Sequence, residues 1–293
     1  MNLTVTVLEI VAPVFLLAGI GFAWVRVGLE YRIQFVTRLA MTLSLPCLIF
    51  VSLMQTRIDP AALTALSLAS VVAYAAVTVL FLLFVRLGRL ETRTYSAPLI
   101  FGNTGNLGLP LALFAFGDAG LSYAIIVFAI MALWSYTFGI WLVAGSGAFG
   151  KVLREPLVWG TVLGALFLWQ GWQTPVFLTN TLTLVGQMAI PMMLITLGVA
   201  VARLSGRGLM RAAVLSTLKL AACTGIAWTV GRYFELDPVA FGVLVLQVAT
   251  PVAVTSYLIA EKYGADAQAV AGLVVASTLI SVGALPLILA AVL

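Results

Sequence analysis

Long apolar runs follow one another along almost the whole chain, and they limit its fold more than any other feature. Of the 293 residues, 63% are hydrophobic and only 9% are charged, whereas soluble domains carry about 25% charged residues. A helix needs ~20 apolar residues to cross a bilayer, and the alternating pattern of a membrane β-barrel is absent. We therefore predict an all-α integral membrane protein with ten transmembrane helices. The predicted spans are residues 7–26, 33–56, 61–86, 95–116, 119–143, 156–171, 175–202, 209–231, 238–262 and 266–292.

The basic residues lie mainly in short loops, where they indicate how the chain crosses the membrane. Twelve Lys and Arg residues fall in the odd-numbered loops between spans, and two, Arg57 and Arg232, fall in the even-numbered ones. Cytoplasmic loops carry an excess of Lys and Arg, so we predict that the odd loops are cytoplasmic and that both termini face outside. The net charge of +5 then reflects topology and does not indicate a nucleic-acid partner.

The two halves of the chain share proline landmarks at similar spacing. SLPCLIF, with Pro46, aligns with AIPMMLI, with Pro191, at a shift of 145 residues, and Pro110 aligns with Pro251 at a shift of 141. Each half holds five spans, and an odd number forces the second copy to enter the membrane upside down. The alternative is a chance alignment of two apolar sequences. The predicted transmembrane unit and its two repeats are residues 1–293, 1–145 and 152–293.

The fourth and ninth spans are interrupted near their middle. NTGNLGLPLALFAFG contains Pro110, and LQVATPVAVTSYLIAEKYG contains Pro251. A proline inside a membrane helix removes a backbone donor and clashes with the preceding turn, and irregular backbone at that depth survives only inside protein or beside a wet cavity. Because the second repeat is inverted, we expect these broken helices to cross near the bilayer centre, with their second halves beginning near Leu109 and Pro251.

This crossing is the predicted substrate site. Interrupted spans in matching places of two halves point to the binding site of a transporter, and helix N-termini there favour an organic anion. Amides and a hydroxyl beside the prolines can add hydrogen bonds, and glycines let a ligand approach the backbone. The alternative is that the amides only satisfy backbone groups freed by the breaks. The candidates are Asn103, Asn106, Gln247 and Thr250 for the substrate, and Pro110, Pro251, Gly105 and Gly108 for the crossover.

Lys219, in the sequence STLKLAAC, lies near the middle of the eighth span and is a further substrate-binding candidate. An ionisable residue at that depth is a functional-site hypothesis by default, because it could attract an anion or pair with a carboxylate. The alternative is snorkelling toward the membrane surface near Arg211, which is ~12 Å away along a helix. The sequence leaves both interpretations open.

Catalytic, metal and cofactor sites are not indicated. The chain has no histidine, which excludes a Ser-His-Asp triad, a Cys-His pair and the usual zinc sites. GSGAFGKV resembles a phosphate-binding loop but ends in Val152, where Ser or Thr should hold magnesium. Cys47 and Cys223 lie within apolar spans, where cysteine behaves as a small hydrophobe. We therefore predict neither an enzyme nor a bound metal or cofactor.

At the two interrupted spans the chain resembles the auxin efflux carrier family. The matching stretches are GNTGNLGLPLALFAFG, the segment from LQVATPVAV to the C-terminal LPLILAAVL, and, more weakly, SLPCLIFVSL. The resemblance implies an NhaA-like or bile-acid-symporter-like fold, with a five-plus-five inverted repeat in which helices 4 and 9 cross. It implies scaffold helices 1, 2, 6 and 7, transport helices 3 to 5 and 8 to 10, crossover prolines at Pro110 and Pro251, and a polar position at Asn106. Elevator-like movement and a homodimer are also implied. The chain lacks the long central loop of the plant members, as bacterial members do, so we expect it in a bacterial inner membrane.

Together these features predict a secondary transporter that moves a small organic anion, a carboxylate or an auxin-like acid, by elevator-type alternating access. A membrane-embedded sensor or scaffold that binds the same ligand without moving it is the alternative. An intramembrane enzyme ranks below both because no catalytic cluster is present. Export of an anion can run on the membrane potential alone, at ~2.3 kcal/mol per charge per 100 mV, and proton or sodium coupling are the other options.

Overall fold

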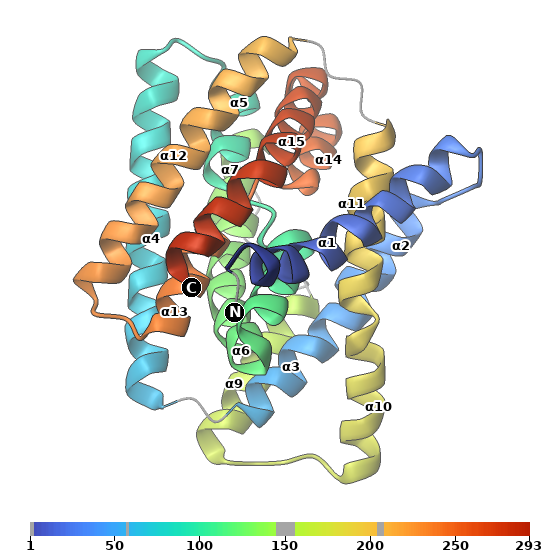
Figure 1. The fold of residues 1–293 in the computed structure, drawn as a ribbon, viewed down its shortest axis with the longest axis vertical. Helices are drawn as coiled ribbons and strands as arrows, with labels where there is room; N and C mark the ends of the chain where they lie inside the picture. The colour runs from blue at the N-terminus through green and yellow to red at the C-terminus, as the bar shows by residue number, and fades with distance from the viewer. Residues whose placement is uncertain (1–2, 57–58, 145–155, 204–207) are drawn as a thin grey trace.

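The computed structural model describes residues 3–56, 59–144, 156–203 and 208–293, which form helices joined by short connections (Figure 1). Seven helical stretches among these residues are long and apolar enough to cross a membrane, and α9 and α13 are shorter apolar helices. The described chain therefore has the all-helical architecture of an integral membrane protein. In order, the elements are α1 Leu3–Arg26, α2 Ile33–Leu39, η1 Ala40–Ser44, α3 Leu45–Gln55, α4 Pro60–Leu87, α5 Thr92–Ile100, η2 Thr104–Gly108, α6 Leu109–Trp134, η3 Ser135–Gly139, α7 Ile140–Ala144, α9 Pro156–Gln170, α10 Val176–Gln187, α11 Ala189–Arg203, α12 Leu209–Tyr233, α13 Pro238–Val248, α14 Val254–Tyr263 and α15 Ala267–Val292.

The end of the fourth predicted span and the start of the fifth form one continuous element. This element, α6, changes direction at Gly117, whose φ of 64° and ψ of −155° are not helical. Glycine adopts a positive φ at little cost, so Gly117 provides the corner that the sequence places between two spans. The stretch Thr104–Val143, 40 residues long, therefore counts as one of the seven long stretches although it bends along its length.

Small residues bring pairs of helices into close contact. A Cβ added at Gly21 of α1 would collide with the backbone of Ile195 in α11, and one at Gly198 would collide with the backbone of α1. Gly160 of α9 lies against Pro46 of α3 in the same way. Helices associate in lipid mainly by close packing, and small residues let their backbones approach. Glycines therefore allow the backbones of α1 and α11, and of α3 and α9, to pack in direct contact.

The breaks between α5 and η2 and between α13 and α14 lie against each other. Gly102 and Val252 form an isolated antiparallel bridge, and the backbone N–H of Asn103 donates to the carbonyl of Pro251 over 2.7 Å. Unpaired backbone groups inside a membrane protein are strongly unfavourable. Each unwound segment thus supplies hydrogen-bond partners to the other where the two broken helices cross.

The second half of the fourth span begins earlier than its proline suggested. η2 begins at Thr104, whereas the sequence placed the start near Leu109. Pro110 lies in the first turn of α6, directly after the π-helical turn η2, and this wider turn accommodates a residue without a backbone donor. In the bridge, Gly102 faces Val252, the neighbour of Pro251. Pro110 and Pro251 therefore do not occupy matching positions in the crossing.

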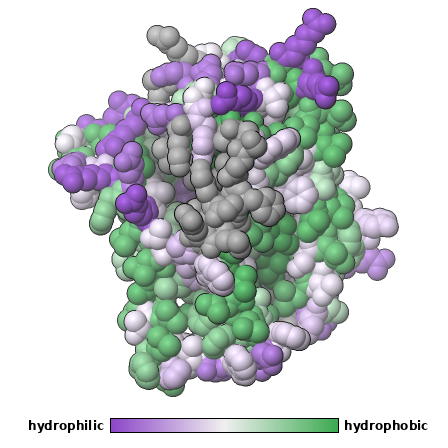
Figure 2. All heavy atoms as spheres, turned by 180° about the vertical axis from the view of Figure 1, so that it is seen from behind, coloured by the Kyte–Doolittle hydropathy of each residue, from purple (hydrophilic) through white to green (hydrophobic). Residues whose placement is uncertain are grey.

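Polar residues gather at one end of the molecule. Figure 2 shows hydrophilic residues concentrated at its upper end, above a broad hydrophobic surface. The loop between α1 and α2, with Arg32, and the turn between α4 and α5, with Arg89, both lie at the upper end in Figure 1. The remaining predicted loop features, Arg57, Lys151, Arg154, Arg207 and the string GSGAFGKV, lie outside the described residues.

Candidate functional site

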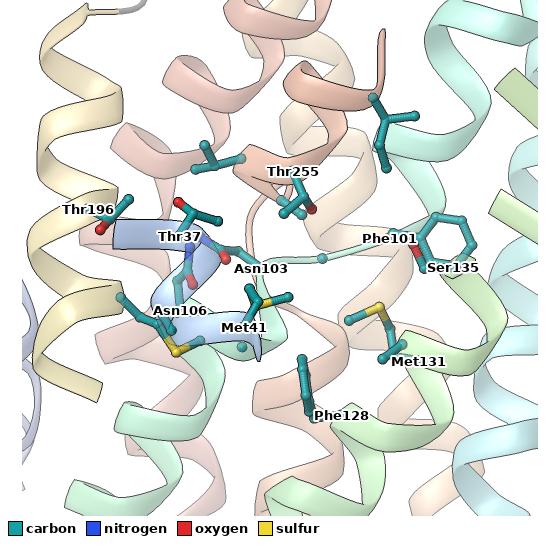
Figure 3. A pocket seen from close by; sticks show the side chains of 18 of the residues that line it. Thr37, Met41, Phe101, Asn103, Asn106, Phe128, Met131, Ser135, Thr196 and Thr255 are labelled. Carbon is teal, nitrogen blue, oxygen red and sulfur yellow. The ribbon is translucent and has the colours of Figure 1, made fainter. Parts of the chain in front are cut away.

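A pocket lies on one face of the crossing, between the unwound segments and helices α2, α6, α11 and α14 (Figure 3). Its volume is about 80 Å³, several times the roughly 10–15 Å³ that one water needs on this measure. The pocket therefore has room for a molecule of several heavy atoms. The described residues that line it are Ile33, Thr37, Ala40, Met41, Phe101, Gly102, Asn103, Gly105, Asn106, Phe128, Met131, Ala132, Ser135, Met193, Thr196, Ala253, Val254, Thr255 and Ile259.

Two helices begin at this pocket without a side-chain cap. η2 follows Asn103 and α14 follows Ala253, and neither of these residues makes a capping hydrogen bond through its side chain. Asn106 near the start of η2 and Thr255 near the start of α14 line the pocket. The first N–H groups of a helix have no partner within it, and each N-terminus is equivalent to about +0.5 of an elementary charge. The two ends together present about one positive charge to an occupant of the pocket.

Asn103 and Asn106 bring side-chain amides to the same pocket. Figure 3 shows both on one side of it, near Thr37. Asn103 is only 4% exposed, and its Nδ2 has no hydrogen-bond partner. An unpaired buried donor destabilises a protein by about 1–3 kcal/mol. A ligand oxygen that accepted this hydrogen bond would remove that cost.

The opposite side of the pocket is apolar. Phe128, Met131 and Phe101 lie across from the asparagines in Figure 3, and Met193 of α11 adds a further apolar side chain to the lining. A Cβ at Gly105 would lie 3.1 Å from side-chain atoms of Phe128 and Met193, so a larger residue at that position would press on the apolar wall. None of the described residues that line the pocket is charged. An apolar part of an occupant would contact this wall.

Gln247, Thr250 and Lys219 do not line this pocket but lie behind the crossing. Lys219 Nζ donates to the backbone carbonyl of Thr250 over 2.9 Å, and Thr250 Oγ1 donates to the carbonyl of Gln247 over 2.7 Å. Gln247 Nε2 donates to the carbonyl of Ala124 over 3.3 Å, and a Cβ at Gly108 would collide with Gln247 Oε1. These three predicted substrate residues therefore bond to backbone carbonyls behind the crossing, whereas the two asparagines line the pocket.

Several pocket residues come from helices that the sequence analysis did not connect with the crossing. The hydroxyl residues among them are Thr37 of α2, Ser135 of η3 in the fifth predicted span, and Thr196 of α11. The only signal in the sequence was an isolated hydroxyl within an apolar span, and such hydroxyls commonly bond their own helix backbone. Thr196 Oγ1 does so, to the carbonyl of Met192 over 2.6 Å, and it also bonds the Tyr31 hydroxyl over 2.8 Å.

A wider groove, of about 620 Å³, adjoins the pocket and shares residues of α2 and α14 with it. Its lining includes Arg32, Arg203, Glu30 and Glu261. Arg32 pairs with Glu30 over 2.7 Å, and Arg203 Nη2 donates to the carbonyl of Tyr31 over 2.7 Å. Burial raises the pKa of Tyr31 above its ordinary value of 10.0, against the effect of its side-chain hydrogen bond. The groove thus forms a polar approach to the pocket with both signs of charge.

Matches to known proteins identify the family of this chain. A family model described as a membrane transport protein matches residues 6–152 and 148–289. The chain belongs to this family, that of the auxin efflux carriers. The family resemblance seen at the interrupted spans is thereby confirmed.

Two archaeal relatives of this family member are named as uncharacterized transporters. The one from Methanothermobacter thermautotrophicus is 26% identical over 294 residues, which cover 95% of this chain and 96% of the relative. The one from Methanocaldococcus jannaschii is 24% identical over 196 residues, and the match covers 62% of each chain. The family and these names identify a multi-pass membrane transporter and not an enzyme, as the sequence predicted.

Proposed function

We propose that the chain is a secondary transporter of a small organic monoanion with an apolar body, such as a monocarboxylate, bound in the pocket at the crossing. The observation that carries this proposal is the pair of uncapped helix N-termini beside the unpaired amide of Asn103, in a pocket whose described lining holds no charged side chain. The two N-termini supply about one elementary charge in total, which matches one carboxylate group. The aromatic and methionine wall suits the apolar remainder of such a molecule.

The packing of the helices supports alternating access between two groups. α1 packs on α11, and α3 packs on α9 and α10, while α12 packs on α13, α15 and α4. We assign the first group to a scaffold of spans 1, 2, 6 and 7 and the second to a transport domain of spans 3 to 5 and 8 to 10. The pocket is lined by both groups, so an elevator-type shift of the crossing past α2 and α11 would move its ligand.

The proposed carrier is one unit of residues 1–293 with a five-plus-five inverted repeat, residues 1–145 and 152–293, in a bacterial inner membrane. The polar groove reaches the loop that carries Arg32. Because basic loops face the cytoplasm, we place this groove on the cytoplasmic side and both termini outside. A homodimer, which the family resemblance implies, is part of the same proposal.

A ligand screen tests the assignment. Thermal-shift titrations of the purified protein compare monocarboxylates that carry apolar tails with dicarboxylates and with the neutral amides of the same acids. We expect monocarboxylates to raise Tm most, because a second carboxylate lacks a matching positive end and an amide lacks the charge. An amide that stabilises the protein as strongly as its acid would overturn the anion assignment.

Flux measurements then test transport itself. Liposomes that contain the reconstituted protein are loaded with the best unlabelled ligand. They should take up labelled ligand from outside in exchange for the ligand inside. Saturable binding without exchange would reject a carrier and favour the sensor or scaffold that the sequence leaves open. The thermal-shift screen therefore tests which ligand binds, and the flux assay tests whether the protein transports it.

A further inference from the structure

A second, smaller cavity lies on the other face of the crossing, around Lys219. This cavity of about 10 Å³ is close to the volume that one water needs. Lys219 is 2% exposed, so it does not snorkel to the surface of the chain. Its Nζ donates to the carbonyl of Thr250, and the ion pair found among the described residues, between Arg32 and Glu30, lies elsewhere. The lysine is thus held by a backbone carbonyl, beside serines that line the same cavity, and has no carboxylate partner in the described chain.

The groups around this cavity are arranged as hydrogen-bond acceptors. Ser281 Oγ donates its hydrogen to the carbonyl of Thr278 over 2.7 Å, and Ser277 Oγ donates to the carbonyl of Val274 over 3.2 Å. Ser216 Oγ also donates to a backbone carbonyl, over 3.5 Å. Each hydroxyl has given its hydrogen to the backbone, and Ser277 Oγ also accepts from the backbone N–H of Val252 over 3.0 Å. At least one lone pair of each serine therefore remains for a donor or a cation in the cavity. These three serines line the cavity together with Lys219.

The backbone contributes negative charge at the same place. Thr250 follows the last turn of α13, whose C-cap is Ala249. A helix C-terminus is equivalent to about −0.5 of an elementary charge, and the carbonyls of unwound segments and half-helix C-termini are the groups that coordinate sodium in other transporters with broken helices. Lys219 Nζ therefore lies at the position where an oxygen-coordinated monovalent cation would be stable.

We propose that the ammonium group of Lys219 occupies a monovalent-cation site behind the crossing, so that the protein carries a tethered cation in place of a dissociable one. The site stands on its own geometry. Its consequence for transport, that substrate binding needs no sodium, rests on the proposed function. A shortened side chain at this position would leave an empty site of cation-binding character, lined by Ser216, Ser277, Ser281 and the carbonyl of Thr250.

Chemical rescue of Lys219→Ala tests the site without any substrate. Alanine keeps Cβ, and n-propylammonium has the three carbons and the nitrogen of the part removed. We expect Tm of the variant to fall by roughly 5 °C, the scale on which a protein of this size registers loss of a charged hydrogen bond. n-Propylammonium chloride should restore most of this loss, while n-propanol, which has the same shape and no charge, should not. The wild-type protein should have the same Tm in sodium chloride and in choline chloride at equal ionic strength.

Lys219→Met is the matched control, because methionine fills most of the same space without charge or donor. It should be destabilised and should not respond to n-propylammonium, since the cavity stays filled. Rescue of Lys219→Ala by n-propanol as well as by the ammonium ion, or wild-type stability in Lys219→Met, would show that the lysine only fills space. Selective stabilisation of the wild type by sodium would also overturn the proposal.

If Lys219→Ala does not fold, Lys219→Met and the sodium comparison on the wild type still decide the question. None of these measurements uses a carboxylate ligand. Failure of the monocarboxylate screen would therefore leave the cation site intact, and failure of the rescue would leave the anion pocket intact.

Discussion

The two faces of the crossing are made by the same unwound backbone and have opposite character. One face holds two helix N-termini, the amides of Asn103 and Asn106, and a pocket of about 80 Å³ with no charged residue among its described lining. The other holds the C-terminal end of α13, three serines and the ammonium of Lys219 in a cavity of about 10 Å³. A break in a helix exposes both ends of its dipole. The chain can therefore attract an anion on one side without a basic side chain there, and hold a cation on the other.

The difference also separates the residues that the sequence grouped together. Lys219 was one candidate for the anion site, with snorkelling as the alternative, yet it contacts the C-terminal side of the break, where its positive charge faces the negative end of the helix. The asparagines contact the N-terminal side, where they add donors to unpaired N–H groups. The asparagines thus lie at helix N-termini and Lys219 lies at a helix C-terminus, so the two ends of the broken helices form two separate sites.

Gly102→Ala should have the largest effect, because it disturbs both faces together. A Cβ at this position would collide with Thr250 Oγ1, and Gly102 forms the bridge to Val252. Forcing a methyl group into closely packed backbone costs about 3 kcal/mol. We expect a large fall in Tm in detergent and loss of ligand-induced stabilisation.

Gly225→Ala is the control for this change. Gly225 lies in α12 with open space where a Cβ would project, so alanine there should be neutral or stabilise the helix by about 0.5–1 kcal/mol. A Gly102→Ala protein as stable as wild type would mean that the two segments do not meet as closely as the bridge between Gly102 and Val252 indicates.

Much of this fold follows from the sequence, and the exceptions have physical causes. Apolar length alone gave the span at 209–231, which the structure has as Leu209–Tyr233, and Pro251 lies inside the ninth break as predicted. The start of the second half-helix was predicted too late, near Leu109. The π-helical turn η2 before Pro110 accommodates a residue without a backbone N–H, and the helix is interrupted before η2 instead. The pocket walls from α2 and α11 could not be predicted, because packing between distant helices leaves no local pattern.

Asn106→Asp replaces a neutral amide at the pocket by a negatively charged carboxylate of nearly the same shape. A carboxylate beside a bound anion at ~5 Å costs about 3 kcal/mol at an effective dielectric constant near 20, which corresponds to roughly 100-fold weaker binding. Isothermal titration with the best monocarboxylate at neutral pH measures the change. Undiminished affinity would place the anion away from Asn106, and a protein that instead gained affinity for an organic cation would strengthen the comparison between the faces.

Asn106→Ala sharpens the same comparison by removing the amide without adding charge. The helix N-termini remain, so we expect about tenfold weaker binding, the value of one hydrogen bond to a charged group. The fold should be preserved, because Asn106 lies at the pocket and is partly exposed. Equal binding in a scintillation assay by Asn106→Ala and wild type would assign recognition to the backbone alone.

Tyr31→Phe should have the smallest effect, because Tyr31 lines the groove and reaches the pocket only through its hydrogen bond to Thr196. The change removes one hydrogen bond, that between the Tyr31 hydroxyl and Thr196 Oγ1, worth about 1 kcal/mol, and Thr196 keeps its bond to the carbonyl of Met192. The pKa of Tyr31 is raised above 10.0, so the stability that the neutral phenol provides is complete below pH 10 and is lost as the pH rises through the folded-state value. The difference in Tm between wild type and variant should accordingly be constant near neutral pH and shrink in strongly alkaline buffer. Tyr31→Phe should leave anion affinity unchanged, and adding it to Lys219→Ala should leave the n-propylammonium rescue unchanged. A shift in either would show that the groove contributes to a face of the crossing.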